Sequence, residues 1–182
     1  MMEGEVNMFH YPIDDELKLV LLQRRHAEEL KELIDSSREH LAGLDWVEST
    51  KAVEDTRNFI EYALDKFAKD EEMHCAILYN DKIAGVTGLN QINRQVKFVE
   101  IGYWLGRKFT GNGIMTRVVN GWVDYVFKTM KLDRIEIYTA YQNKKSRAVA
   151  QRAGFEEEAV LKKRIPYFDE IDDMVIYTKL RD

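Results

Sequence analysis

Two closely spaced glycines, Gly111 and Gly113, flank Asn112 directly before a predicted helix. Glycine lets the backbone adopt positive φ and come close to a bulky anion. The first turn of a helix leaves main-chain N–H groups unpaired and carries a partial positive charge, and both suit a phosphate. A simple glycine turn before a helix would have the same sequence. Thr116 replaces the third glycine of a Rossmann fingerprint and no P-loop sequence is present, so neither of those phosphate motifs applies.

A second segment, residues 143–155, decides in favour of a phosphate site. It begins Asn143-Lys-Lys-Ser146 and follows the next predicted strand. Together with Lys108-x-x-Gly111-x-Gly113, it resembles the GNAT N-acetyltransferase superfamily, in which the position of Lys108 is more often Gln or Arg. Residues 100–105 and the spacing of Asn143 and Ser146 are similar to the RimJ/RimL-type ribosomal-protein alanine N-acetyltransferases. The resemblance covers nearly the whole chain in element order.

The resemblance implies a binding site for acetyl-CoA. The pantetheine arm would pair like an added strand with residues 103–105, and the pyrophosphate would lie on the N–H groups of residues 108–116. Asn143 would bond the pantetheine, although an N-cap role explains the same residue. The helix from Ser146 would line the thiol end. The implied cofactor residues are Tyr103, Trp104, Leu105, Lys108, Gly111, Asn112, Gly113, Ile114, Met115, Thr116, Asn143 and Ser146.

Acyl transfer from a thioester requires a neutral amine, but α-amines with a pKa of ~8 are mostly protonated at pH 7. A base must therefore remove a proton, directly or through water. Glu100 is the best candidate, because it shares a strand face with Phe98, Gly102 and Trp104. Apolar neighbours should desolvate its carboxylate and raise its pKa. The alternative is a glutamate at the rim or in a salt bridge.

The departing thiolate needs a proton or a hydrogen bond, and Ser146 could donate it. A hydroxyl at a helix N-terminus is the alternative role for this serine. Ala150 occupies the place where many members of the superfamily carry a tyrosine acid. A main-chain N–H group of residues 100–105 could hold the oxyanion. The remaining phenols are expected in the core or at the rim, and they are Tyr138, Tyr141 and Tyr167.

Composition excludes several other classes of protein. The chain has 182 residues, 32 acidic and 27 basic, with a net charge of -5, which argues against a protein that coats nucleic acid. Apolar runs are too short for a membrane span of ~20 residues, and the N-terminus lacks the pattern of a secretory signal, so we expect a cytoplasmic protein. Cys75 is the single cysteine and fits a core position. The histidines show no ligand spacing, so we expect no metal site; they are His10, His26, His40 and His74.

The elements that must position these residues follow from apolar periodicity. A strand at 17–21 precedes two helices, the second capped by Ser49 or Thr50 with Phe67 on its buried stripe. A hairpin over 74–89, a strand at 97–105, a helix at 114–130 and a strand at 134–139 follow. A helix at 144–153 and two antiparallel strands at 155–164 and 174–180 complete the order. We expect an α/β fold with a mixed sheet, helices on both faces, and a parallel crossover from 97 to 139.

The predicted function is acetyl transfer from acetyl-CoA to a primary amine by a single domain over residues 1–182. By resemblance, the sheet is mostly antiparallel and the acceptor is the N-terminal α-amine of a protein, plausibly ribosomal. Acetylation of a small amine, such as a polyamine or an antibiotic-like compound, is one alternative. A non-catalytic CoA-binding regulatory module is another. A homodimer is common in this branch, and no nucleic acid or membrane partner is expected.

Overall fold

The computed structural model describes residues 10–181. The N-terminal pattern on which the absence of a secretory signal was predicted lies outside the described residues. No helix within 10–181 is long and apolar enough to cross a membrane.

A single sheet of eight strands runs through the described chain in the order β1-β2-β3-β4-β5-β6-β8-β7. All neighbouring strands pair antiparallel except β5 and β6, which are parallel. The mostly antiparallel α/β fold and the parallel crossover are therefore confirmed. The strands are β1 (Tyr11–Pro12), β2 (Leu17–Leu21), β3 (Met73–Tyr79), β4 (Lys82–Asn93), β5 (Phe98–Leu105), β6 (Arg134–Ala140), β7 (Glu156–Tyr167) and β8 (Glu170–Leu180).

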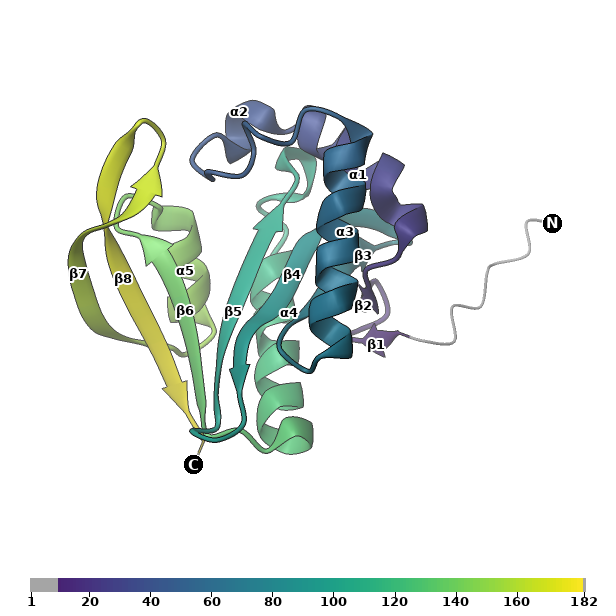
Figure 1. Cartoon of the computed structure of the whole chain (residues 1–182). Coiled ribbons are helices and arrows are strands. Elements are labelled where there is room, and N and C mark those ends of the chain that lie inside the picture. The colour runs from purple at the N-terminus through teal and green to yellow at the C-terminus, as the bar shows by residue number, and fades with distance from the viewer. Residues whose placement is uncertain (1–9, 182) are drawn as a thin grey trace.

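Helices cover both faces of the sheet (Figure 1). Helix α1 packs on β4 and α3 on β3, while α4 packs on β5 and α5 on β6. The amphipathic sequence of α4 explains its placement, since its apolar stripe is buried and Trp122 donates a 2.9 Å hydrogen bond to Thr87 on β4. The helices are α1 (Ala27–Asp35), α2 (Arg38–Leu41), α3 (Val53–Ala68), α4 (Ile114–Asp124) and α5 (Lys144–Arg152), with short turns at Arg24–His26, Arg107–Phe109 and Tyr125–Met130.

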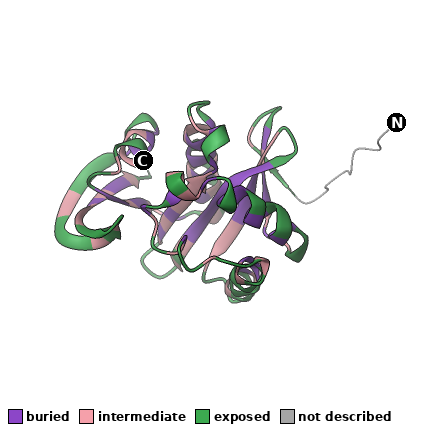
Figure 2. Ribbon diagram, turned by 90° about the horizontal axis from the view of Figure 1, so that it is seen from above, coloured by how far each residue is buried: buried purple, intermediate pink, exposed green. Residues whose placement is uncertain are grey.

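The buried residues gather between the sheet and the helices, whereas the β7–β8 hairpin is largely exposed (Figure 2). Ile60, Ile77, Leu89 and Ile101 are among the largest fully buried side chains, and they come from α3, β3, β4 and β5. The strands that carry the predicted site residues are therefore fixed by the core on both faces.

Strands β5 and β6 separate part of the way along their length. Their parallel pairing runs from Phe98 and Arg134 to Glu100 and Glu136, and then stops. Strand β5 continues to Leu105 and β6 to Ala140 without pairing to each other, so the two strands diverge as Figure 1 shows. The opening faces the loop that begins α4.

Several details of the predicted elements are wrong. Helix α3 begins after Ala52 and is capped by Asp55, whose carboxylate accepts 2.8 Å bonds from the N–H groups of Lys51 and Ala52. Ser49 and Thr50 instead donate their hydroxyls to the carbonyl of Trp46. Ser49 and Thr50 lie before the N-cap position, which is Ala52, so neither hydroxyl caps the helix.

Other differences concern exposure and length. Phe67 is 40% exposed, because it lies in the last turn of α3 beyond the edge of the core. The predicted helix at 114–130 changes to a π-helical turn after Asp124. Short β1 and α2 were missed, and the final hairpin is longer than predicted at its turn, where β7 continues to Tyr167 and β8 begins at Glu170.

Candidate active site

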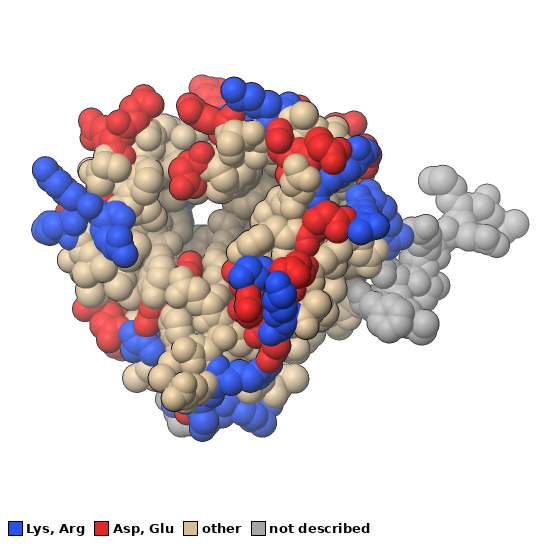
Figure 3. Space-filling model, viewed as in Figure 1, with Lys and Arg blue, Asp and Glu red and all other residues tan. Residues whose placement is uncertain are grey.

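The divergence of β5 and β6 opens a cleft of about 1210 Å³, called here the β5–β6 cleft. Figure 3 shows the surface hollowed between the β7–β8 side and the helical side. The cleft is lined by the end of β5, the loop into α4, the end of β6 and the start of α5. The predicted residues that line it are Tyr103, Trp104, Leu105, Gly111, Gly113, Ile114, Met115, Thr116, Asn143 and Ser146.

Three other predicted residues lie outside this lining. Glu100 belongs to the stretch where β5 and β6 still pair. Lys108 places its ammonium 5.0 Å from the ring centre of Phe109, and the Asn112 amide donates to the Phe109 carbonyl at 3.5 Å. The positive charge along the cleft comes instead from Lys144, Lys145 and Arg152 of α5, which line it.

The glycine loop has the backbone geometry of an anion cradle. Gly111 and Gly113 have φ of 85° and 69°, and a Cβ on either would point into space with no atom within 4 Å. The first hydrogen bond of α4 runs from the N–H of Arg117 to Gly113, at 3.2 Å. The N–H groups of Ile114 and Met115 therefore have no partner inside the helix. These groups line the cleft and fit a pyrophosphate.

The free edge of β5 fits an extended chain. One edge of Tyr103, Trp104 and Leu105 pairs with β4, at Thr87, Val86 and Gly85. The opposite edge faces the β5–β6 cleft, because the pairing with β6 has ended. Main-chain groups on that edge can bond an amide-containing arm such as pantetheine as an added strand would.

A phenol and a hydroxyl meet at the inner end of the β5–β6 cleft. The Tyr103 hydroxyl lies 3.1 Å from Ser146 Oγ and also donates to the Ser146 carbonyl at 3.3 Å. Burial raises the pKa of Tyr103 to about 12, so this phenol keeps its proton at neutral pH. The sequence interpretation used only the backbone of Tyr103 and missed this contact. Strand alternation was the available signal, because it places Tyr103 on the face opposite to Glu100.

Asn143 caps α5, since its side-chain oxygen accepts a 3.1 Å bond from the Ser146 N–H. The N-cap interpretation of this residue is thus correct. The residue also lines the β5–β6 cleft, so its amide nitrogen remains available to a ligand.

Glu100 is half-buried on the α3 side of the sheet. Burial raises the pKa of its carboxyl, the nearby carboxylates of Glu136 and Glu72 raise it further, and a hydrogen bond from Asn90 opposes them. Its two oxygens accept 3.4 Å bonds from the amides of Asn90 and Gln91. The carboxylate does not line the β5–β6 cleft.

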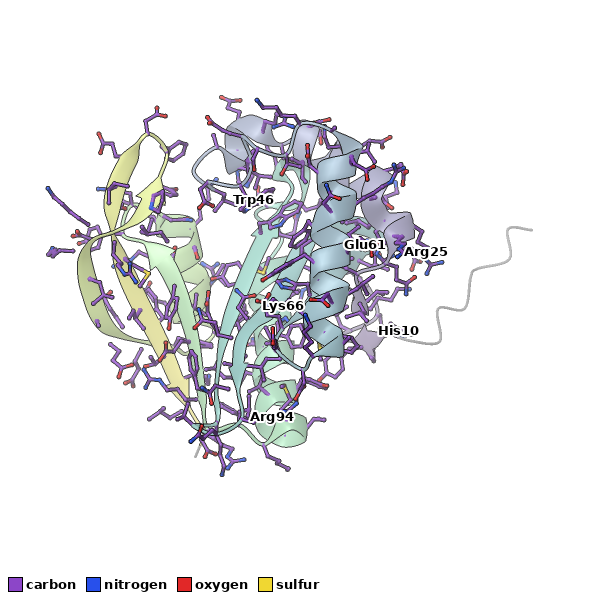
Figure 4. All side chains as sticks on the ribbon, viewed as in Figure 1. His10, Arg25, Trp46, Glu61, Lys66 and Arg94 are labelled. Carbon is purple, nitrogen blue, oxygen red and sulfur yellow. The ribbon has the colours of Figure 1, made fainter. Side chains whose placement is uncertain are left out.

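A separate cavity of about 580 Å³, called here the second chamber, lies between α1, α3 and strands β4 and β5. It shares Leu44, Tyr103 and Trp104 with the β5–β6 cleft. Trp46 projects from the loop after α2 towards the end of β5 (Figure 4), and its ring centre lies 5.4 Å from that of Trp104. The two cavities therefore meet near the end of β5, at Tyr103 and Trp104.

The loop after α2 and the β7–β8 hairpin approach each other over the mouth of the β5–β6 cleft. Gly43, in the loop after α2, lies so close to the β7–β8 hairpin that a Cβ there would be 2.6 Å from the Tyr167 ring. Phe168 also lies within 3.2 Å of that Cβ position. Sequence reasoning did not predict this contact, because the residues are far apart in the chain.

Cys75 is buried on β3, as predicted, and desolvation raises the pKa of its thiol to about 12. Within residues 10–181, no group of three or more His, Cys, Asp or Glu side chains is placed to hold a metal ion. Tyr138 and Tyr167 are half-buried and Tyr141 is 44% exposed, so the spare phenols lie at the rim.

Comparisons with known proteins give a consistent assignment. The model of a family described as an acetyltransferase (GNAT) domain matches residues 16–156. The ribosomal-protein-serine acetyltransferase of Escherichia coli (strain K12) is 28% identical over 171 residues, which are 93% of this chain and 96% of that protein.

Two solved structures are similar over nearly the full length. The microcin C7 self-immunity acetyltransferase MccE, in complex with acetyl-CoA and AMP, has a TM-score of 0.89 and 32% identity, covering 93% of this chain and 94% of its own. RimL, a ribosomal L7/L12 alpha-N-protein acetyltransferase in complex with CoA, has a TM-score of 0.91 and 25% identity, covering 95% and 98%.

Proposed function

The chain belongs to the acetyltransferase (GNAT) domain family, and on this premise we propose that it acetylates the N-terminal α-amine of a protein, plausibly a ribosomal one. The family and its RimJ/RimL-type relatives, predicted from residues 100–116 and 143–155, are confirmed. The chain is accordingly an acetyl-CoA-dependent N-acetyltransferase. A single domain over residues 1–182, a cytoplasmic location and a homodimer stay predictions.

The observation that carries the proposal is the position of the glycine loop at the open end of the β5–β6 cleft. Unpaired N–H groups at the start of α4 would hold the pyrophosphate, and the free edge of β5 would hold the pantetheine. A pantetheine lying along Tyr103, Trp104 and Leu105 brings its thioester towards Tyr103 and Ser146.

The reacting groups follow from this placement. The Tyr103 phenol and the Ser146 hydroxyl would protonate or hydrogen-bond the departing sulfur. A main-chain N–H on β5 would stabilise the oxyanion. Glu100, with its raised pKa, would take a proton from the acceptor amine through water, since it does not line either cavity.

A second candidate acceptor is a small amine. The structural similarity to MccE, whose structure holds AMP beside acetyl-CoA, favours it. The 580 Å³ of the second chamber is within the size range of sites for small molecules. A non-catalytic CoA-binding module would bind coenzyme in the β5–β6 cleft and transfer nothing.

The experiment uses a cell lysate incubated with the protein and isotopically labelled acetyl-CoA. Mass spectrometry then searches for labelled protein N-termini and labelled small amines. Labelled N-termini that are absent when the protein is omitted support the proposal. Label only in small amines favours the second candidate, and no label with intact CoA binding favours the non-catalytic module.

A further inference from the structure

The floor of the second chamber is a row of three residues across the sheet. His74 on β3 is opposite Gly88 on β4, which is opposite Gly102 on β5. Adjacent strands are about 4.8 Å apart, so the backbone of β3 lies about 10 Å from β5, and the imidazole extends from β3 over Gly88. A Cβ on Gly102 would be 2.8 Å from the side-chain nitrogen of Asn90, so the Asn90 amide covers Gly102 on this floor.

The imidazole of His74 is held in one orientation by Glu72. Its Nε2 lies 2.7 Å from the Glu72 carboxylate, which also accepts a 2.8 Å bond from the Tyr62 hydroxyl. The carboxylate fixes the proton on Nε2 and leaves Nδ1 as an acceptor. A Cβ on Gly88 would be 2.6 Å from Nδ1, so this nitrogen lies above the glycine. Among residues 10–181 we find no hydrogen-bond partner for Nδ1.

Thr56 on α3 is a second polar residue in the lining of the second chamber. The residue is only 2% exposed, and its Oγ1 has no hydrogen-bond partner among the described residues. Buried hydroxyls are nearly always bonded, so this hydroxyl is open to a water or to a polar group of a ligand.

Among residues 10–181, the lining of the second chamber offers no unpaired charge. It contains no lysine or arginine, and its one carboxylate, Asp55, is used to cap α3. Its apolar walls include Trp46, Phe59 and Trp104. An acidic group would therefore be desolvated there without a cation to pair with.

We propose that the second chamber holds the acceptor amine and that His74, oriented by Glu72, takes the proton from that amine through Nδ1. This inference rests on the proposed acetyl transfer and assigns the amine proton to His74, which lines the second chamber, in place of a transfer through water to Glu100. Thr56 would bond a polar atom of the same acceptor. The substrate class is a primary amine whose neighbouring groups are uncharged.

In the proposed reaction the acceptor nitrogen loses two protons. The ammonium group gives one proton to His74 Nδ1 and becomes the nucleophile. Its nitrogen then forms a bond to the acetyl carbon, and the bond from that carbon to sulfur breaks. The second proton passes to the thiolate, so the products are the amide, CoA with a free thiol, and a protonated imidazole that returns its proton to water.

The titratable and charged groups that face His74 come from three directions. Glu72 precedes it on its own strand, Tyr62 and Lys66 project from α3, and Glu100 lies on β5. Strand β4 has no charged residue beyond Lys82, at its start. A protonated imidazole cannot accept the amine proton, so His74 would act in its neutral form.

The test compares His74→Asn and Glu72→Gln with Glu71→Gln, a neighbouring carboxylate that pairs with Lys66 instead. Thiol release is measured with acetyl-CoA and a synthetic peptide that has an N-terminal serine and a free α-amine. A thiol reagent reports only CoA, because the one cysteine of the chain is buried. CoA affinity is measured for every variant as a check on folding.

For His74→Asn we expect kcat/KM to fall by roughly 10²-fold or more, with unchanged CoA affinity. Glu72→Gln should lose about tenfold or more, and Glu71→Gln should match the wild type. If the wild type acetylates the peptide and His74→Asn has the same kcat/KM as Glu71→Gln, the role of His74 is overturned while the proposed function stands. Wild-type protein that binds CoA but acetylates neither this peptide nor a panel of small amines overturns the proposed function, and the inference with it.

Discussion

The β5–β6 cleft and the second chamber meet on the same strand but are built from different parts of the chain. Most of the predicted residues of the cleft come from two short segments, around 103–116 and 143–146, and main-chain groups would do much of the binding. The second chamber combines α1, α3, β3, β4 and β5, and side chains such as Thr56 and His74 supply its polarity. Main-chain recognition tolerates changes in side chains, so we expect the cleft to define the cofactor and the chamber to define the acceptor.

The largest effect is expected for Gly113→Val, on CoA binding in the β5–β6 cleft. Gly113→Val would place a side chain where the pyrophosphate lies, so CoA should no longer stabilise the fold. At one hundred times the dissociation constant, the wild type should gain about 2.7 kcal/mol. The thermal shift that CoA causes, measured for the wild type and for Gly113→Val, tests both expectations.

Gly154→Val is the matched control for Gly113→Val. Gly154 also has positive φ, 75°, but does not line the β5–β6 cleft. Both variants carry a similar backbone strain of roughly 1–2 kcal/mol. A CoA shift retained by Gly113→Val, or lost equally by Gly154→Val, would remove the pyrophosphate from the glycine loop.

Glu100→Gln should leave CoA binding intact, and it distinguishes Glu100 from His74 as the base: turnover should fall by roughly 10²–10⁴ if the Glu100 carboxylate is the base, and should change little if His74 is. The rate deficit should shrink as pH rises, because the free amine then forms without help. Measurement of kcat/KM from pH 6 to 10, with CoA affinity alongside, tests this. A wild-type pH profile in the variant would reduce Glu100 to a carboxylate without a catalytic role.

Glu100→Gln should also change how the free energy of unfolding depends on pH. The pKa of Glu100 is raised in the folded protein, so its neutral form is favoured by folding. Its contribution to stability is therefore lost as pH rises from 4.5, the ordinary pKa of a glutamate carboxyl, through the raised pKa. Glu100→Gln should be more stable than the wild type at neutral pH and should lose this advantage below pH 4.5, as denaturant titrations can show.

Tyr103→Phe should have an intermediate effect at the point where the two cavities meet. It removes the hydroxyl that contacts Ser146, and one hydrogen bond to the departing sulfur corresponds to about a tenfold change in kcat. Tyr141→Phe is the control, since that phenol is exposed and belongs to the rim. Equal rates for the two variants would exclude the Tyr103 phenol from the reaction.

The smallest effect is expected for Thr56→Val in the second chamber. The hydroxyl has no protein partner among the described residues, so its loss should not lower the free energy of unfolding. The KM for the acceptor should rise a few-fold, while CoA affinity stays the same. Thr87→Val, whose hydroxyl bonds Gly102 and Trp122, should instead destabilise the fold by about 1–3 kcal/mol. An unchanged acceptor KM in Thr56→Val would contradict the proposed contact.

The sequence predicted the cofactor side better than the acceptor side, for a physical reason. Gly111, Gly113 and Asn143 act through local backbone conformation, which short segments determine. The contact of Tyr103 with Ser146 and the row of His74, Gly88 and Gly102 depend on strand register, which no local pattern records. Tertiary packing also decides which side chains line each cavity, and it left Glu100 outside both.

A crystal structure of the protein with CoA and a peptide carrying an N-terminal serine tests the division between the two regions most directly. We predict that the pyrophosphate lies on the N–H groups at the start of α4, with the pantetheine along β5. The α-amine of the peptide should lie in the second chamber, within hydrogen-bond distance of His74 Nδ1 and beside Tyr103. A peptide bound outside the second chamber, or CoA bound away from the glycine loop, would contradict the account.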